Sequence, residues 1–262
     1  TVPIGGRYHP AIVAQAIGTL ATMYPGRILL GVGNGEAMNE KRFMPYWPNW
    51  IERTERLVEA LDFIRSLWRA DDFFDFDGKY FKMERVFLYV KPRKPVPIYF
   101  SAIGEKAAFC AGKHGDHIIT VNTWQKCRDV IFPQFDRGAR EAGKEIRRME
   151  KVASIIGGIG DIQGAIKRIR KLHAGSMIRE NFNVEDPRKI EESQIELTDE
   201  MIFQNYYLSS TADELIETVD AFRKVGASNL IYTDFSPDPK QTVRVFRKEV
   251  IPYFKEKERG DR

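Results

Sequence analysis

The sequence has few cysteines, no long apolar run and no large excess of one charge. Cys110 and Cys127 are the two cysteines among 262 residues, so a disulfide framework is not expected and a reduced, cytoplasmic protein is predicted. No run approaches the ~18 apolar residues of a membrane span, and no membrane association is expected. Lys and Arg number 41 against 37 Asp and Glu, and the basic residues alternate with acidic ones, so a nucleic-acid partner is not expected either.

Several catalytic motifs are also missing. The chain has no Gly-x-Ser-x-Gly elbow and no Walker lysine. Its four histidines are His9, His114, His117 and His173. His114 and His117 have the spacing of a metal pair but no evident third ligand, so no metal site is predicted. Cys127 lies between Lys126 and Arg128, a setting that lowers the pKa of a thiol, but no catalytic partner is evident.

Apolar strands alternate with amphipathic helices along the chain. This order predicts an α/β protein with a parallel sheet. Five core strands are predicted, at 27–33, 96–102, 116–121, 152–156 and 229–233. Helices are predicted at 10–24, 51–69, 104–113, 125–144, 161–173, 211–226 and 238–257. A hairpin is predicted at 74–81, around Asp77-Gly78, and 174–205 is predicted to be an insertion.

The length allows one (β/α)₈ barrel domain over 1–262, but the strand count is three short of eight, with the shortfall at the front. The predicted helices have clear apolar stripes. The first helix has its stripe at Val13, Ile17, Leu20 and Tyr24, and the helix at 51–69 at Leu57, Leu61, Ile64 and Trp68. A capping box, Thr211–Glu214, opens the helix at 211–226, which is expected to face the core with Leu215, Val219 and Phe222.

The stretch Gly31–Glu40 follows the first apolar strand and concentrates polar side chains. Asn34, Glu36, Asn39 and Glu40 crowd this strand end, where a parallel barrel carries its chemistry. The loop continues for more than a dozen residues before the next helix, which argues against a dinucleotide-binding fingerprint. Taken alone, Glu36 fits a surface carboxylate as well as a catalytic one.

Two further glycine-bearing segments join a strand to a helix. Ser101–Lys106 and Ile156–Asp161 fit either an anion cradle at a helix start or an ordinary turn. Without further context, an ordinary turn is the favoured interpretation of both segments.

Several segments together resemble one family. They are residues 7–16, 24–27, 31–40, 97–102 and 111–116. The pattern resembles the bacterial luciferase-like superfamily, in its branch that uses the deazaflavin coenzyme F420. The stretch Gly31–Glu40 is the most specific part of this resemblance.

The resemblance implies a fold, a coenzyme and a set of site residues. The fold is a (β/α)₈ barrel of the luciferase-like type, with the deazaflavin at the C-terminal ends of the strands, and a homodimer is expected. By position, Glu36 is the acid/base carboxylate. The residues expected to line the coenzyme ring are Asn34, Gly35, Glu36 and Asn39; those expected to receive its phosphate are Ser101, Ala102, Ile103 and Gly104; and those expected to wall the pocket are Ile119 and Val121.

The resemblance also bears on the substrate. Sugar-phosphate dehydrogenases of this branch use three cations for the substrate phosphate, and the matching positions here are Trp124, Glu192 and Asn205. Because charge-assisted contacts to a phosphate would be lost, a small non-phosphorylated substrate is predicted, such as a secondary alcohol and its ketone. Trp124 and Asn205 are assigned to this substrate pocket.

Two alternatives remain open at this point. One is an FMN-dependent monooxygenase of the same superfamily, and the other is a non-catalytic barrel remnant. The family's first strands, with an Asp-His pair and a tryptophan that face the coenzyme, would precede residue 1. The working protein is therefore expected to have about 70 more residues at its front, judged from the size of a βαβ unit.

Overall fold

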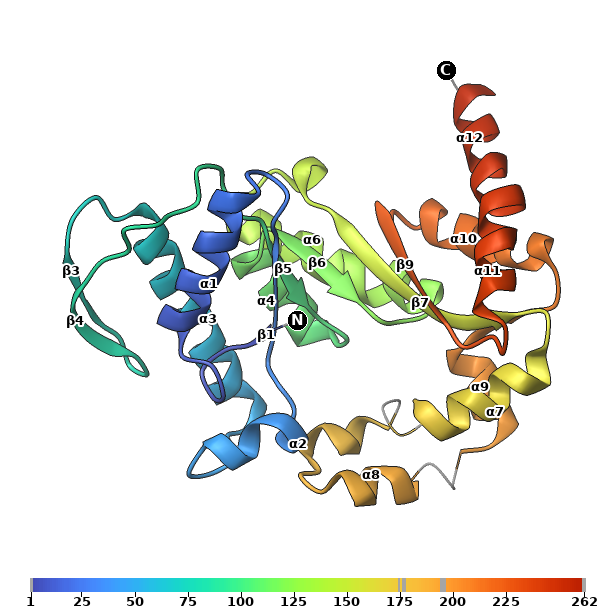
Figure 1. Cartoon of the computed structure of the whole chain (residues 1–262), viewed down its shortest axis with the longest axis horizontal. Helices are drawn as coiled ribbons and strands as arrows, with labels where there is room; N and C mark the ends of the chain where they lie inside the picture. The colour runs from blue at the N-terminus through green and yellow to red at the C-terminus, as the bar shows by residue number, and fades with distance from the viewer. Residues whose placement is uncertain (1, 174, 176–177, 194–196, 261–262) are drawn as a thin grey trace. The chain divides into compact units, whose positions relative to one another are not determined.

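The computed structural model of the chain describes residues 2–173, 175, 178–193 and 197–260. These residues form two compact units. The first comprises the described parts of 1–118, 134–149 and 182–186, and the second those of 119–133, 150–181 and 187–262. Each unit has its own parallel strands and covering helices (Figure 1).

The strands of the first unit run parallel. They are β1 (Val2–Pro3), β2 (Leu30–Gly33) and β5 (Ile98–Ser101), followed in the sheet by β6 (His117–Thr120). The strands predicted at 27–33, 96–102 and 116–121 are therefore confirmed with shorter bounds. The register pairs Pro3 with Gly33 and Val32 with Phe100. Because parallel strands share one direction, the loops after β1, β2 and β5 leave from the same edge.

Two long helices, α1 (Pro10–Met23) and α3 (Trp50–Arg69), pack side by side in this unit (Figure 1). His9 caps α1, because its Nδ1 accepts the N–H of Ala11 at 3.2 Å. Leu57, Leu61 and Ile64 of α3 are buried as predicted, whereas Trp68 is half-buried and its Nε1 donates to the carbonyl oxygen of Ala14 at 3.0 Å.

The predicted buried face of α1 is wrong in part. Val13 is buried, but Leu20 and Tyr24 are 42% and 46% exposed. The buried residues of this helix are Pro10, Val13, Ala14, Gly18 and Ala21. A Cβ at Gly18 would lie 3.1 Å from the carbonyl oxygen of Val90. Small residues face the core here because the neighbouring backbone comes close, and a hydropathy stripe cannot show that requirement.

The predicted hairpin is confirmed, with a longer turn than a two-residue connection. Strand β3 (Phe74–Asp77) pairs antiparallel with β4 (Lys82–Val86). The carboxylate of Glu59 on α3 accepts three consecutive backbone N–H groups of the turn, at residues 79–81, over 2.7 to 2.9 Å. A side chain of α3 therefore holds the hairpin turn.

Helix α4 (Glu105–His114) touches the helix around Gly138 through backbone on both sides. A Cβ at Gly112 would lie 2.0 Å from the carbonyl oxygen of Phe135, and one at Gly138 would lie 2.1 Å from that of Phe109. Any side chain at either glycine would separate the helices. The helix predicted at 125–144 is confirmed as a continuous helical segment over 124–141, made of α5 (Trp124–Lys126), a π-helical turn (Cys127–Ile131) and α6 (Phe132–Glu141).

The second unit is centred on the long strand β7 (Lys151–Ile159). Strand β9 (Asn229–Asp234) pairs in parallel with its first part, and β8 (Tyr207–Ser209) pairs in parallel with its last three residues. β8 was not predicted, because three residues give no readable alternation. The helices are α7 (Ile162–Leu172), α8 (Pro187–Ser193), α9 (Asp199–Asn205), α10 (Ala212–Lys224), α11 (Pro239–Val245) and α12 (Ile251–Gly260), with a 3₁₀ turn at Arg179–Asn183 and a π-helical turn at Phe246–Val250.

The segment Ile156–Asp161 is mostly strand, which corrects its interpretation as a glycine-rich turn. β7 continues through Gly157 and Gly158. A Cβ at Gly157 would lie 1.9 Å from the carbonyl oxygen of Tyr207, and one at Gly158 would lie 2.8 Å from Cβ of Ala165. These glycines allow β8 and α7 to approach β7, and the turn itself is reduced to Gly160 and Asp161 before α7 begins.

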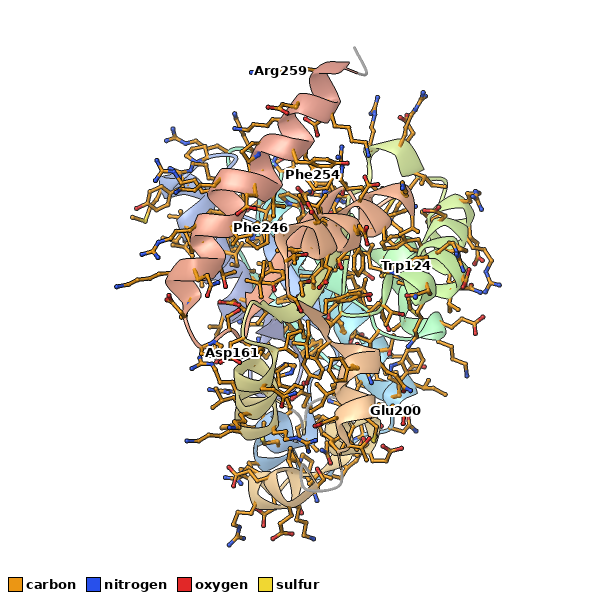
Figure 2. All side chains as sticks on the ribbon, turned by 90° about the vertical axis from the view of Figure 1, so that its right-hand side faces the viewer. Trp124, Asp161, Glu200, Phe246, Phe254 and Arg259 are labelled. Carbon is orange, nitrogen blue, oxygen red and sulfur yellow. The ribbon has the colours of Figure 1, made fainter. Side chains whose placement is uncertain are left out.

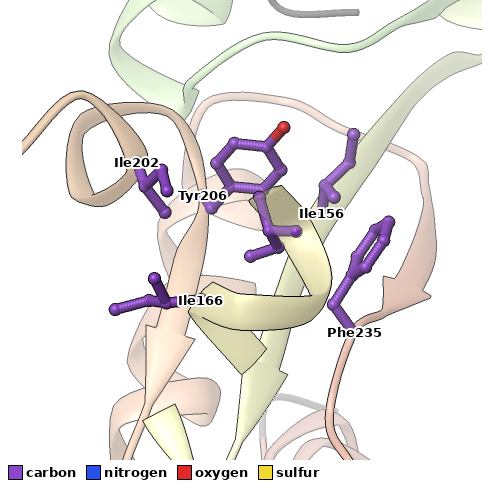
Figure 3. Packing of buried hydrophobic residues seen from close by; sticks show 6 residues of the cluster. Ile156, Ile166, Ile202, Tyr206 and Phe235 are labelled. Carbon is purple, nitrogen blue, oxygen red and sulfur yellow. The ribbon is translucent and has the colours of Figure 1, made fainter. Parts of the chain in front are cut away.

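An apolar cluster joins α7, α9 and β7 (Figure 3). It contains Ile156, Ile166, Ile169, Ile202, Tyr206 and Phe235. His173 Nδ1 lies 2.9 Å from the Tyr206 hydroxyl. The segment predicted as an insertion, 174–205, contains residues outside the described ones, and its status as an insertion stays a prediction.

The C-terminal helical segment packs on β9, where the ring centroid of Phe246 lies 5.0 Å from that of Tyr232. The predicted capping box opens α10, since Thr211 Oγ1 accepts the N–H of Glu214 at 3.3 Å, and Leu215 and Phe222 are buried as predicted. Figure 2 shows Phe246 and Phe254 along the C-terminal helix. Both line a cavity of about 240 Å³ beneath that helix.

Candidate active site

The loop after β2 turns sharply into a short helix. Gly35 has a φ of 73°, a left-handed conformation that favours glycine. Glu36 is the N-cap residue of α2 (Ala37–Glu40), and a 3₁₀ turn (Lys41–Phe43) follows. The region predicted as an irregular loop thus contains one compact turn of helix, directly at the C-terminal end of β2.

The amide nitrogen of Asn34 is hydrogen-bonded, whereas its amide oxygen has no partner among the described residues. Its Nδ2 donates to Thr54 Oγ1 at 2.9 Å, and Thr54 Oγ1 donates to the carbonyl oxygen of Trp50 at 2.8 Å. Asn34 Oδ1 is buried and has no hydrogen-bond partner among the described residues. A buried acceptor in this state suits a ligand that brings a donor.

Glu36 is half-buried, and burial raises the pKa of its carboxyl group. Its side chain makes no capping hydrogen bond to α2. Its backbone carbonyl oxygen accepts the N–H groups of Asn39 at 3.0 Å and Glu40 at 2.9 Å. The carboxyl group is therefore held at a fixed backbone position with its protonation range moved toward neutral pH.

Two other charged residues of this region carry a buried atom without a partner among the described residues. They are Glu40, at Oε1, and Arg53, at Nε. Glu40 is 3% exposed, and its Oε2 accepts the backbone N–H of Arg7 at 2.8 Å. Arg53 lies 4.3 Å from the ring centroid of Trp47. Glu40 was noted in the sequence only as one of the residues crowding the strand end; its place four residues after Glu36 was the available signal.

The predicted anion cradle lies at the end of β5. Ser101 ends the strand, Ala102 is buried, and Gly104 is the N-cap residue of α4 without a side-chain cap. Glu105, in the first turn, accepts Gln134 Nε2 at 2.8 Å. The first-turn amides of α4 therefore have no side-chain acceptor at Gly104, an arrangement that can receive an anion.

The other predicted site residues belong to the second unit. Ile119 is half-buried and Val121 is 41% exposed. The backbone N–H of Trp124 donates to the Tyr207 hydroxyl at 3.1 Å. Asn205 is exposed and its Nδ2 donates to its own helix, at the carbonyl oxygen of Met201, 2.8 Å away. The structure gives the place of each residue in its unit, and their roles stay predictions.

Cys127 and His117 contribute to packing in the structure. Cys127 is fully buried, and burial raises the pKa of its thiol to about 12, which reverses the lowering considered from its basic neighbours. The His117 ring packs 4.5 Å from that of Tyr99. Within the described ranges, no group of three or more His, Cys, Asp or Glu is placed to hold a metal, and no helix there has the length and apolarity needed to cross a membrane.

A family model described as luciferase-like monooxygenase matches residues 1–229. The chain belongs to the luciferase-like family. An F420-dependent glucose-6-phosphate dehydrogenase of Gordonia bronchialis is 33% identical over 254 residues, which cover 94% of this chain and 74% of that protein. The corresponding protein of Segniliparus rotundus is 31% identical over 251 residues, covering 94% and 75%.

Solved structures give the same assignment. An F420-dependent secondary alcohol dehydrogenase in complex with an F420-acetone adduct superimposes with a TM-score of 0.90 at 38% identity, over 96% of this chain and 77% of that one. A coenzyme F420-dependent tetrahydromethanopterin reductase from Methanopyrus kandleri shares the fold, with a TM-score of 0.76 at 20% identity over 95% and 80%. The predicted luciferase-like barrel and the F420-dependent branch of the family are confirmed.

Proposed function

We propose that this protein binds coenzyme F420 and transfers a hydride between it and a small, non-phosphorylated substrate, a secondary alcohol and its ketone. The observation that carries the proposal is the loop after β2, where Glu36 is half-buried with a raised pKa and Asn34 Oδ1 has no partner among the described residues. The names of the relatives support the coenzyme and the reaction class.

The residues of the first unit fit a deazaflavin phosphate. Asn34, Gly35, Glu36 and Asn39 would hold the ring, and Ser101–Gly104 would receive the phosphate at the start of α4. Bound there, the coenzyme would supply a carbon that accepts or returns a hydride. Asn34 Oδ1 can accept a ring N–H, which would satisfy its buried acceptor.

Glu36 is proposed as the acid/base group. Oxidation of a secondary alcohol releases a hydride from carbon and a proton from oxygen, so a group that holds a proton near neutral pH is needed. Burial raises the pKa of Glu36 from its ordinary value toward that range. Its carboxyl group can therefore take up the proton in one direction and return it in the other.

The proposal against a phosphorylated substrate rests on the second unit. Arg128 lies 5.3 Å from the Trp124 ring centroid, but Asp129 holds its guanidinium at 2.6 and 2.9 Å. Glu192 is an exposed acid, and the Asn205 amide is engaged within its helix. None of these three matched positions offers a free cation to a phosphate.

A fluorescence titration of the purified chain with F420, with FMN titrated in parallel, tests the coenzyme. We expect tight binding of F420 and none of FMN. Saturating 2-propanol should then bleach the absorbance of the oxidised coenzyme, and glucose 6-phosphate should not. Binding of FMN alone would favour a luciferase-like monooxygenase, and binding of neither would contradict the coenzyme assignment.

A homodimer belongs to the same proposal. Helix α1 has no charged residue over its 14 positions, and Ile12, Leu20 and Met23 are 61%, 42% and 62% exposed. A surface helix of this composition suits an apolar contact with a second copy. Sedimentation of the wild type should give a dimer, and Met23→Glu should shift it toward monomer; an unchanged monomeric mass for both would contradict the dimer.

A further inference from the structure

Glu40 is a buried carboxylate that the proposed chemistry does not use. It is 3% exposed, on the last position of α2. Its Oε2 accepts the backbone N–H of Arg7 at 2.8 Å, and its Oε1 has no partner among the described residues. A buried carboxyl group with a single hydrogen bond is costly to the fold, so its position calls for an explanation.

The guanidinium of Arg7 forms no ion pair with Glu40 among the contacts of the described residues, and its charge lowers the pKa of Glu40 by less than burial raises it. The guanidinium lies over two rings instead, 5.1 Å from the centroid of Tyr8 and 5.7 Å from that of Phe43. The hydrogen bond that Arg7 donates to this carboxylate comes from its backbone N–H. Gly6, the preceding residue, leaves the space for this contact, because a Cβ there would lie 3.0 Å from Glu40 Oε2.

The contact joins two loops at one edge of the sheet. The Gly5–Arg7 turn follows β1, and α2 follows β2, with Pro3 and Gly33 paired at the ends of the two strands. Glu40 lies one helical turn after Glu36, and its backbone N–H donates to the Glu36 carbonyl oxygen at 2.9 Å. A shift of Glu40 would therefore move the N-cap of α2, where Glu36 is located.

We propose that Glu40 is a positioning residue, which fixes the orientation of Glu36 by attaching α2 to the Gly5–Arg7 turn. The inference rests on the proposed function, since it assigns Glu36 the proton transfer. Buried polar groups that lower stability are expected where a site needs a defined geometry.

Two variants of Glu40 test the attachment in the full chain. Glu40→Gln keeps an oxygen that can accept the Arg7 N–H, whereas Glu40→Ala removes it. Glu40→Ala is expected to weaken F420 binding about tenfold, to lower kcat more than it changes KM for the alcohol, and to speed hydrogen exchange at the Arg7 amide. Glu40→Gln should restore all three to within about threefold of the wild type.

A stability control separates positioning from general weakening. Val219→Ala, in α10, should lower Tm without changing coenzyme affinity or kcat. Wild-type binding and turnover in Glu40→Ala, or equal losses in Glu40→Gln and Glu40→Ala, would overturn the positioning role while leaving the proposed function intact. Failure of the wild type to bind F420 would overturn both.

Discussion

Two glycine-bearing strand ends, Gly31–Glu40 and Ile156–Asp161, look alike in the sequence and differ in the structure. After β2 the chain leaves the sheet at once, and Asn34 and Glu40 each keep a buried oxygen without a partner among the described residues. From Ile156 to Ile159 the chain stays in the sheet as the end of β7, and Gly157 packs on the backbone of Tyr207.

The comparison shows what separates a ligand site from a packing contact. A glycine needed for packing is one whose missing Cβ would collide with backbone of the protein itself. A strand end suited to a ligand has polar atoms that the protein leaves unsatisfied. The number of glycines does not distinguish the two cases.

The largest effect is expected at Gly157. In Gly157→Ala the new Cβ would lie 1.9 Å from a backbone oxygen that cannot rotate away, so we expect a loss of at least about 3 kcal/mol, or failure to fold. Chemical denaturation measures this. Gly143→Ala is the matched control, because Gly143 has a φ of 68° but no atom within 4 Å of a built Cβ, and backbone strain of about 1 kcal/mol is expected. Equal losses would contradict the packing explanation.

Glu36→Gln should leave the fold intact and remove activity. An amide cannot exchange the proton, so kcat is expected to fall by about 10²- to 10⁴-fold with little change in F420 affinity. Bleaching of F420 by a secondary alcohol gives the rate. Glu217→Gln, which changes an exposed acid of α10, should keep the wild-type rate. A Glu36→Gln rate close to wild type would remove Glu36 from the acid/base role.

Asn34→Ala is expected to weaken F420 binding about tenfold, because the ring would lose a buried acceptor. Thr54→Val removes the hydroxyl that holds Asn34 Nδ2 but keeps Asn34 itself, so a smaller loss is expected. Fluorescence titration compares the two. A larger effect from Thr54→Val than from Asn34→Ala would show that Asn34 supports the loop instead of the coenzyme.

The smallest effects are expected in the pH dependence of stability, to which Glu40 and His173 should contribute with opposite signs. Burial raises the pKa of Glu40 in the folded protein. Its contribution to stability is therefore present at low pH and is lost as the pH rises from the pKa of the unfolded state through the higher pKa of the folded state. Burial lowers the pKa of His173 in the folded protein. Its contribution to stability is therefore lost as the pH falls below the pKa that the imidazole has in the unfolded state. Two charged residues near Glu40 are Arg7, whose charge lowers the pKa of Glu40, and Glu36, one helical turn away.

Thermal unfolding from pH 5 to pH 8 tests these signs. Glu40→Gln should raise Tm by a few degrees at pH 8 and by less at pH 5. His173→Gln should reduce the fall in Tm that the wild type shows between pH 8 and pH 5. The same pH dependence in wild type and both variants would assign the titration to other groups.

Much of the fold was predictable because strands and helices have distinct apolar periods. The hairpin, α3, α4 and the capping box of α10 follow from such local patterns. The buried face of α1 and the strand β8 did not, since close backbone contact at Gly18 and pairing of three residues depend on parts of the chain distant in sequence.

The site was predictable to the level of segments. Glu36 and its neighbours stand out as polar residues after a buried strand, and the family resemblance gave each of them a role. The state of each polar atom could not be read from the sequence. The unsatisfied Oδ1 of Asn34 and the attachment of Glu40 to Arg7 are set by three-dimensional contacts over 20 and 33 positions.

The reciprocal glycine contact at Gly112 and Gly138 has a consequence for redesign of the protein. With backbone against backbone, α4 has little freedom to slide or tilt, so the phosphate proposed for its first turn would have to be fitted by the loop before it. Directed evolution toward another coenzyme should therefore collect substitutions in Ser101–Gly104, and α4 should tolerate few changes on the side that faces Gly138.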